Sequence, residues 1–366
     1  MTSSAISLII TKVTKYIKSF TCWNQLLVLM FGQLSGRESL RDVIVAVEAH
    51  QAKAYGLGFG KGVTRSNLVK ANQNRDYHIF EEFAYYMVEQ ARALRVTKIF
   101  NLGGNIYAFD STTIELCLAV FCWATFRRKK GGIKIHTLFD IEFFHITPAS
   151  VHDTKAMSEI PLEAGAYYIF DRAYNFFEQL FRIDAIGAYF VVRAKKNLKY
   201  KVVRWKRRMP QGVLSDSMIE LTGYASNKHY PKTFRRVVYF DQEQNRELTF
   251  ISNAMDISAL EVALLYKNRW SVELFFKWLK QHLKIKKFWG DSENAVRIQI
   301  YSAIISYCLV AIVQSKLNIE RSIYETLQNL SISLTDKTPL KDLFNKSNFS
   351  IDKELDGFNE PTLFDY

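Results

Sequence analysis

The sequence has little of several residue types whose abundance would place it in a specialised class of protein. Its 366 residues include only 6 Pro, 16 Gly and 4 Cys. These low counts exclude a collagen-like chain, a low-complexity disordered chain and a small scaffold held by disulfides. The hydrophobic share of 48% and the charged share of 23% are those of a globular protein. At this length we expect about two to three domains.

The cysteines are few and badly placed for a metal site. They form no CxxC pair, and none has a histidine at the spacing of a zinc ligand set. We therefore expect Cys22, Cys117, Cys122 and Cys308 to be buried thiols in a reducing compartment.

Long apolar runs are also missing. No segment reaches the roughly 18 consecutive apolar residues that cross a membrane. The closest, residues 298–313, is interrupted by Gln299, Ser302 and Ser306, so we predict a buried core helix there and no membrane partner. Residues 5–10 are apolar but lack preceding basic residues and a clear cleavage site, which predicts a cytoplasmic protein without a secretory signal.

The chain has an excess of positive charge. Lys and Arg number 49 against 36 Asp and Glu, a formal charge of +13. Such an excess favours a polyanionic partner where the positive residues cluster. The densest cluster comprises Lys195, Lys196, Lys199, Lys201, Arg204, Lys206, Arg207 and Arg208.

Residues 1–95 are predicted to form a helical domain, because apolar residues recur there at helical spacing. One helix is expected over 23–34. A second is expected to begin at a capping box formed by Ser35 and Glu38.

Two more helices are predicted over residues 64–71 and 79–94. The first has polar side chains on one face, including Arg65 and Asn67. This pattern is compatible with a DNA reader of the helix-turn-helix type and equally with a helical packing or dimerisation module.

Two apolar runs, residues 105–110 and 166–171, each end in a carboxylate, Asp110 and Asp171. Each run is typical of a buried strand, so both acids are expected at the C-terminal edge of a sheet, where α/β proteins bind ligands. A carboxylate in such a place is costly to bury unless it is paired or bound to a metal. We therefore predict an α/β core whose first part spans 96–194.

The rest of the chain divides by composition. Residues 195–250 are predicted to be a β-rich basic insertion, and 251–330 to be the second part of the core. A capping box of Ser258 and Glu261 should open a long helix that reaches about residue 283. Residues 331–366 are expected to form a peripheral tail.

This long helix carries Tyr266, Arg269, Glu273 and Lys280 at intervals of three, four and seven residues, which places them on one face. Alone, Glu273 would be interpreted as a helix salt bridge or a solvated residue. Together with the two aspartates it gives three acids from three elements. That composition is expected of a site that holds two hard divalent ions, most naturally Mg²⁺.

Two histidines, His136 and His152, lie near the predicted site in the sequence. A lone histidine beside a strand is more often a packed or supporting group than a ligand. We therefore leave both outside the predicted ligand set.

These residues resemble those of a known family. The segment Asp171-Arg-Ala-Tyr174 and the Tyr266, Arg269, Glu273, Lys280 series are similar to the second-aspartate motif and the Tyr-Arg-Glu-Lys signature of DDE transposases of the insertion sequence 4 family. Further similar features are Asp-Ser-Thr at Asp110, Lys134-x-His136 with Asp140, and Val151-His-Asp153. The N-terminal segment 24–42 resembles the helical domain that often precedes this catalytic domain, so the resemblance covers about residues 20–315.

The resemblance implies an α/β fold with an RNase H-like catalytic core, a β-rich insertion before the third acid, and a preceding α-helical DNA-binding domain. It implies a transposase of a bacterial insertion sequence that binds terminal inverted repeats and cleaves and transfers DNA strands. Asp110, Asp171 and Glu273 would be the catalytic ligands of two Mg²⁺ or Mn²⁺ ions. Its partners would be double-stranded element ends, target DNA and a second copy in a synaptic homodimer, and its location would be the nucleoid.

Side chains that we expect to contact DNA are basic, polar or aromatic. They are Tyr266, Arg269, Lys280, Trp205, Arg204, Arg207, Arg65 and Asn67. Trp205 has two interpretations: it accepts an extruded base by stacking, or it packs on the sheet of the insertion, with Tyr224 and Tyr230 as rival stacking groups.

Two other functions stay open at this point. One is a non-catalytic nucleic-acid-binding protein on a decayed RNase H-like scaffold, against which the intact set of acids argues. The other is a nuclease that cleaves without joining, which would share the same active site.

Overall fold

The computed structural model describes residues 20–60, 63–94, 105–127, 130–139, 143–269, 273, 276, 280, 288–319, 321, 323–336 and 338–345. The α-helices are α2 (Cys22–Leu34), α3 (Leu40–Ala49), α4 (Gln51–Gly56), α5 (Arg65–Asn74), α6 (His78–Ala93), α7 (Asp153–Ser158), α8 (Phe177–Ala185), α9 (Tyr224–His229), α10 (Ala259–Asn268), α12 (Glu293–Leu317), α13 (Ile323–Ser333) and α14 (Leu340–Asn345). The strands are β1 (Ile106–Leu116), β2 (Thr125–Arg127), β3 (Lys130–Phe139), β4 (Phe143–Pro148), β5 (Tyr167–Phe170), β6 (Tyr189–Arg193), β7 (Tyr200–Trp205), β8 (Val213–Leu221), β9 (Phe234–Asp241) and β10 (Arg246–Ser252).

The N-terminal part is helical, as predicted, but one helix start differs from the expectation. Ser39 caps α3 in a reciprocal capping box with Asp42, whereas Ser35 is the C-cap of α2. The predicted box of Ser35 and Glu38 is wrong because Gly36, at φ +65°, still belongs to the turn between the two helices. The predicted start of α5 is confirmed: the hydroxyl of Thr64 accepts a hydrogen bond from the Asn67 amide.

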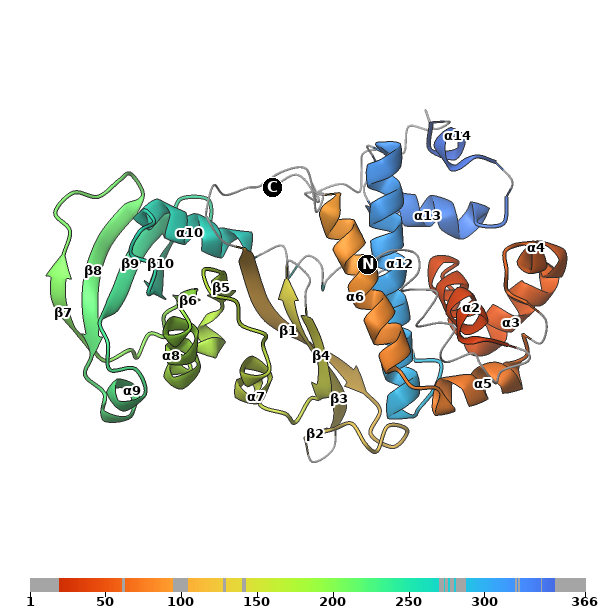
Figure 1. The fold of residues 1–366 in the computed structure, drawn as a ribbon, viewed down its shortest axis with the longest axis horizontal. Helices are drawn as coiled ribbons and strands as arrows, with labels where there is room; N and C mark the ends of the chain where they lie inside the picture. The colour runs from red at the N-terminus through yellow and green to blue at the C-terminus, as the bar shows by residue number, and fades with distance from the viewer. Residues whose placement is uncertain are drawn as a thin grey trace.

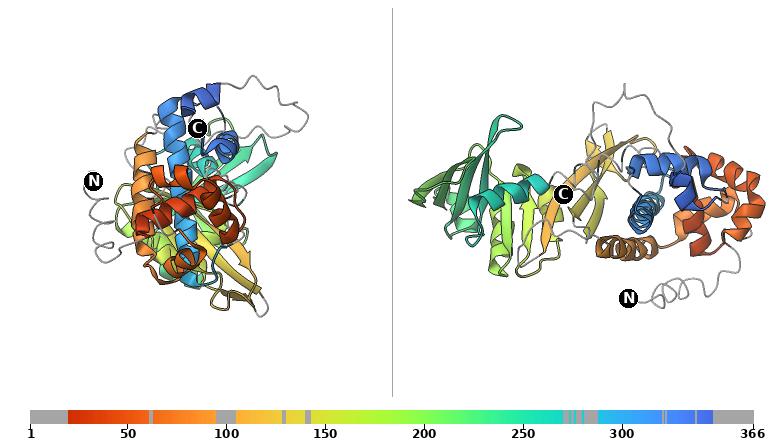
Figure 2. Two further views of the ribbon diagram at one scale, coloured as in Figure 1. Left: turned by 90° about the vertical axis from the view of Figure 1, so that its right-hand side faces the viewer. Right: turned by 90° about the horizontal axis from the view of Figure 1, so that it is seen from above.

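The long helix α12 lies among the N-terminal helices and packs against α2, α5 and α6 (Figures 1 and 2). By length and composition it is apolar enough to span a membrane, but 78% of its most apolar window is buried inside the protein. This confirms the prediction of a buried core helix.

A mixed sheet forms the other half of the molecule (Figure 1). Its strands follow the order β2-β3-β1-β5-β6-β10-β9-β8-β7, and β4 also pairs with β3. β1 is antiparallel to β3 and parallel to β5, which is parallel to β6. The order β4-β3-β1-β5-β6 is that of an RNase H-like core, which confirms the predicted fold class.

The alternation of side chains along β5 separates two hydrophobic layers. Tyr168 and Phe170 belong to a cluster with residues of α7 and α8. Tyr167 and Ile169 belong to the larger cluster, which contains residues of α10 and of the N-terminal helices. The core strands are therefore buried on both faces, as their continuous apolar runs predict.

The predicted β-rich insertion extends the same sheet instead of forming a separate one. β10 pairs with β6 in antiparallel register, so β10, β9, β8 and β7 continue outward from the core (Figure 2). β7 is the last strand, and its side chains are almost all exposed.

One prediction about the cysteines is wrong. Cys22 and Cys308 are buried, but Cys117 and Cys122 are exposed because they lie in the turns that follow β1 and not in the core. In the predicted tail the structure describes α14 and the end of α13, while residues 346–366 lie outside the described part of the chain.

Candidate functional site

The parallel pairing of β1 with β5 brings the two aspartates together. Its register ends with Phe109 opposite Phe170, so Asp110 and Asp171 are the next residues on the two neighbouring strands. The expectation that Asp110 ends its strand is wrong. β1 continues to Leu116 because it forms a long antiparallel ladder with β3, and Asp110 lies opposite Thr137 in that ladder.

Tyr174 supports this pair of acids from the face of the sheet that α7 and α8 cover. It is buried, its ring packs edge-on against Phe109 at 5.2 Å, and its hydroxyl donates to Ser111 Oγ at 3.1 Å. Ser111 follows Asp110, and Tyr174 ends the short 3₁₀ helix that begins after Asp171. The tyrosine therefore ties the loop of the second acid to the strand of the first, a contact that sequence reasoning missed.

α10 approaches the acids from the other face of the sheet. It begins at the predicted capping box, in which Ser258 and Glu261 each bond the other's backbone amide. The prediction of one helix to about residue 283 is wrong, because α10 ends at Asn268 with Arg269 as its C-cap. Residues 270–272 lie outside the described chain, and Glu273 is again helical.

Tyr266, near the end of α10, fixes Asp171. Its hydroxyl donates to Asp171 Oδ1 at 2.8 Å, and its ring lies against Phe250 with centroids 4.8 Å apart. Burial raises the pKa of Tyr266 to about 12, so the phenol stays protonated and donates at neutral pH.

Arg269 lies at the centre of the site and is only 5% exposed. One terminal nitrogen donates to Asp110 Oδ2 at 2.6 Å and the other to Glu273 Oε1 at 2.5 Å. Its guanidinium carbon lies 5.3 Å from the centre of the Tyr266 ring. Arg269 thus connects Asp110 with Glu273, and Tyr266 on α10 binds Asp171.

The electrostatics of the two aspartates differ. Burial, together with the negative charges of Glu273 and Asp171, raises the pKa of Asp110 to about 6, although Arg269 opposes the shift. Burial also acts to raise the pKa of Asp171. Hydrogen bonds from Tyr266 and the Arg172 amide outweigh it and hold that pKa below its usual value.

The chemistry of the three acids fits a hard divalent cation. They supply only oxygen ligands, and burial is the main cause that raises the pKa of Asp110, so a cation beside its carboxylate would offset the cost of keeping it charged. The described residues contain no ready-made group of three or more ligands, since Arg269 lies between Asp110 and Glu273. Arg269 bonds one oxygen of each of these two acids, Asp110 Oδ2 and Glu273 Oε1.

His136 is fully buried on β3, directly opposite Ser111. Its Nε2 is 3.1 Å from Thr147 Oγ1, and burial lowers its pKa to about 4, so the imidazole is neutral. His152 caps α7 through Thr154. Both placements agree with the supporting role that we expected, outside the ligand set.

The residues expected to contact DNA fall into a buried and an exposed group. Tyr266 and Arg269 are buried against the acids, so contacts of these two with DNA stay predictions. Lys280 is helical and partly exposed. The exposed members are Arg204, Trp205, Arg207, Arg65 and Asn67.

Trp205 is 68% exposed on the edge strand β7 and does not pack into the insertion. The alternative that it packs on the sheet is therefore wrong. Of its two rivals, Tyr224 is exposed whereas Tyr230 is buried among Phe181, Phe190 and Phe234.

Comparison with known protein families gives two matches. The model of a transposase DDE domain matches residues 101–309, more than half of the chain. A second model, described as a domain of unknown function, matches residues 11–60.

Three similar proteins are named as transposases. A putative transposase of Sinorhizobium fredii is 36% identical over 214 residues, 56% of this chain and 59% of the relative. A probable transposase for the insertion sequence element IS5377 of Geobacillus stearothermophilus is 31% identical over 208 residues, 55% and 54% of the two chains. A putative transposase for the element IS4SA of Synechocystis is 26% identical over 270 residues, 69% and 72%. The chain thus matches little more than half the length of the first two relatives.

Proposed function

Since this chain belongs to the transposase DDE domain family, we propose that it is the transposase of an insertion sequence. It binds the terminal inverted repeats of its element, cleaves the DNA strands there and joins them to target DNA. The observation that carries this proposal is the convergence of Asp110, Asp171 and Glu273 on Arg269 and Tyr266. Two relatives are named as transposases of insertion sequence elements, which supports the same conclusion.

In this proposal Asp110, Asp171 and Glu273 hold two Mg²⁺ or Mn²⁺ ions. When bound, the ions supply activation of the attacking oxygen and charge stabilisation of the leaving oxygen. The protein's own residues prepare the site. Tyr266 donates to Asp171 Oδ1 and holds that carboxylate in place, while Arg269 keeps Asp110 and Glu273 close together.

Phosphate binding is proposed for Lys280 and for Arg269 once it has released an acid, since both carry charges that suit phosphate oxygens. On the insertion, Trp205 with Arg204 and Arg207 offers an exposed basic and aromatic edge for the DNA end. The exposed side chains of Arg65 and Asn67 on α5 suit recognition of the terminal repeat. Synapsis of two ends by a homodimer is part of the same proposal.

The nuclease without joining activity is the second candidate, because the same acids would serve it. Purified full-length protein should be incubated with Mg²⁺ and a DNA that carries the element's ends, with nicking and joining scored separately. Both activities are expected. Nicking without joining would favour the nuclease, and binding without either activity would favour the non-catalytic scaffold.

A further inference from the structure

The insertion contains a buried ion pair. Asp216 on β8 and Arg235 on β9 are 3% and 2% exposed. Arg235 Nε donates to Asp216 Oδ1 and its Nη2 to Oδ2, both at 2.7 Å, which is the two-pronged arginine–carboxylate geometry. Although burial raises the pKa of Asp216, the hydrogen bonds and charge of Arg235 hold it below its usual value.

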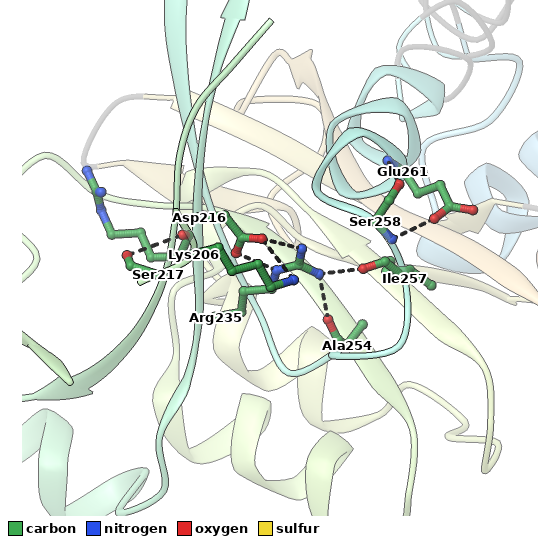
Figure 3. Close-up of polar contacts among 9 residues, drawn as sticks. Lys206, Asp216, Ser217, Arg235, Ala254, Ile257, Ser258 and Glu261 are labelled. Atoms are coloured by element: carbon green, nitrogen blue, oxygen red, sulfur yellow. Dashed lines mark hydrogen bonds and ion pairs between the residues drawn. The ribbon is translucent and has the colours of Figure 1, made fainter. Parts of the chain in front are cut away.

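The remaining terminal nitrogen of Arg235 points away from β8 and β9. Nη1 donates to the carbonyl of Ile257 at 2.6 Å and to that of Ala254 at 3.3 Å (Figure 3). These carbonyls belong to the turn that ends at Ser258, the N-cap of α10. Arg235 thus binds the insertion to the segment that immediately precedes the helix carrying Tyr266.

The other end of α10 holds the candidate site. Tyr266 and Arg269 contact all three acids; Tyr266 lies on α10, which begins at the Ser258 cap, and Arg269 is the C-cap of that helix. A ten-residue helix is about 15 Å long, so a tilt of about 4° at its start displaces its end by about 1 Å. A displacement of this size in an active site can cost about a hundredfold in rate.

We infer that Arg235, held in place by Asp216, is a positioning residue that fixes the start of α10 and thereby sets Tyr266 and Arg269 against the acids. The expected effect of Arg235 on cleavage rests on the proposed function, whereas its expected effect on the position of α10 does not. A buried arginine is suited to this task because it reaches a carboxylate and two carbonyls at once, which lysine does not.

Removing Arg235 would leave the buried Asp216 carboxylate with Lys206 as its remaining cation, and would remove the donor that Arg235 supplies to the two carbonyls. Lys206 does not replace it. Its ammonium lies 3.1 Å from Asp216 Oδ2 but its side chain is 61% exposed, so solvent screens this second contact. The turn before α10 is therefore expected to lose its anchor when Arg235 is lost.

Arg235→Met tests the inference, and Arg236→Met is its matched control. Arg236 is the next residue of β9, so its side chain leaves the opposite face of the sheet, where it lies over the Tyr200 ring at 5.1 Å. Spin labels at Leu214→Cys on β8 and Leu264→Cys on α10, both exposed positions, report the distance between insertion and helix. The exposed Cys117 and Cys122 are replaced by Ser in every variant.

With Arg235→Met we expect a broadened or shifted distance distribution by pulsed electron resonance and a cleavage rate lowered at least tenfold, with the Kd for end DNA within threefold of the parent. Arg236→Met should match the parent in all three. A distance distribution and a cleavage rate equal to those of Arg236→Met would overturn the inference.

Arg235→Lys keeps the charge and is the second variant, to be used if Arg235→Met does not fold by circular dichroism. The same outcomes are expected of it, and parental behaviour would again overturn the inference. Failure of the proposed function gives a different result from failure of this inference. If the proposed function is wrong, the parent protein does not cleave DNA, and the distance measurement still reports the position of α10.

Discussion

At the scale of single residues, the site depends on how charge is balanced in a buried place. Arg269 is one cation between the carboxylates of Asp110 and Glu273, and Asp171 accepts the hydrogen bond from Tyr266. A buried cation of this kind is strongly stabilised only while its partners are charged. The protonation of Asp110 therefore affects how strongly Arg269 is held in the site.

The raised pKa of Asp110 predicts a pH dependence of stability. The folded state holds a proton on Asp110 up to about pH 6, whereas the unfolded chain releases it near 3.8. Between these values the folded state binds more protons, so the free energy of unfolding falls as pH rises, by at most roughly 3 kcal/mol. Urea unfolding at pH 4 to 7 without divalent ions should show this decline in the parent relative to Asp110→Asn. Parallel pH curves for the two proteins would contradict the assignment.

Trp205 offers a second residue-scale prediction. Because its ring is exposed beside basic residues, Trp205→Ala should reduce any cleavage step that needs an extruded base by ten- to hundredfold, since stacking contributes about 1 to 3 kcal/mol per base. First-strand nicking, which needs only the acids, should change little. The measurement is an assay that resolves nicking from hairpin closure. Equal loss of both steps, or no loss of either step, would refute base stacking.

At the scale of elements, α10 connects the insertion to the acids. Its start is determined by a capping box and by Arg235, and its end delivers Tyr266 and Arg269. A substitution that destabilises α10 should therefore lower the cleavage rate as well as the free energy of unfolding, whereas an equally destabilising substitution in another helix should lower only the free energy of unfolding.

The N-caps of α3 and α10 allow a test of this role of α10. Ser258→Ala and Ser39→Ala each remove the hydroxyl of a reciprocal capping box, so each should lower the free energy of unfolding by about 1 kcal/mol. Only Ser258→Ala should also lower the cleavage rate, because α3 does not carry a site residue. Melting curves and cleavage rates of both variants are compared with the parent. An equal effect of the two substitutions on cleavage would show that α10 has no special role.

Several elements were predictable because their signals are local. The strands before Asp110 and Asp171, and the box of Ser258 and Glu261, follow from apolar runs and short-range hydrogen bonds. The box at Ser35 was wrong because Ser39 with Asp42 fits the same pattern four residues later. The end of α10 at Asn268 is not predicted, because the regular spacing of Tyr266, Arg269, Glu273 and Lys280 continues past it in the sequence.

The residues of the site are predictable from the sequence to a greater degree than the contacts between them. The spacing of residues 266–280 predicts only a shared helix face, and the family resemblance joins Glu273 to the two aspartates. Neither indicates that Arg269 bridges Asp110 and Glu273. The pair of Asp216 and Arg235 was missed altogether. Both strands hold several charged residues, and nothing in the sequence singles out Asp216 and Arg235 as the buried pair.

At the scale of the whole molecule, the N-terminal helices and α12 form one unit. The amide of Asn294 on α12 donates to the carbonyls of Asn72 and Arg75 at the end of α5, and Tyr301 donates to Glu81 on α6. The proposed boundary at residue 95 thus separates segments that share one hydrophobic core.

A fragment of residues 1–95 is therefore expected not to unfold cooperatively, because it lacks α12 and the apolar surface that α12 covers. Thermal melting followed by circular dichroism should give a broad, shallow curve for the fragment and a cooperative transition for the full chain. A sharp transition in the fragment would show that the N-terminal helices are stable alone. Contacts of Arg65 and Asn67 with DNA are accordingly best tested by alanine substitution in the full chain.

The most direct test of the central claim is cleavage of end DNA by Glu273→Gln under saturating Mg²⁺. The substitution keeps the size of the side chain and removes a proposed charged ligand, so we expect cleavage to fall at least a hundredfold while DNA binding stays nearly unchanged. Glu247→Gln, at an exposed position on β10, is the matched control and should cleave like the parent. Cleavage by Glu273→Gln within about tenfold of the parent would contradict the account, since loss of a metal ligand costs far more.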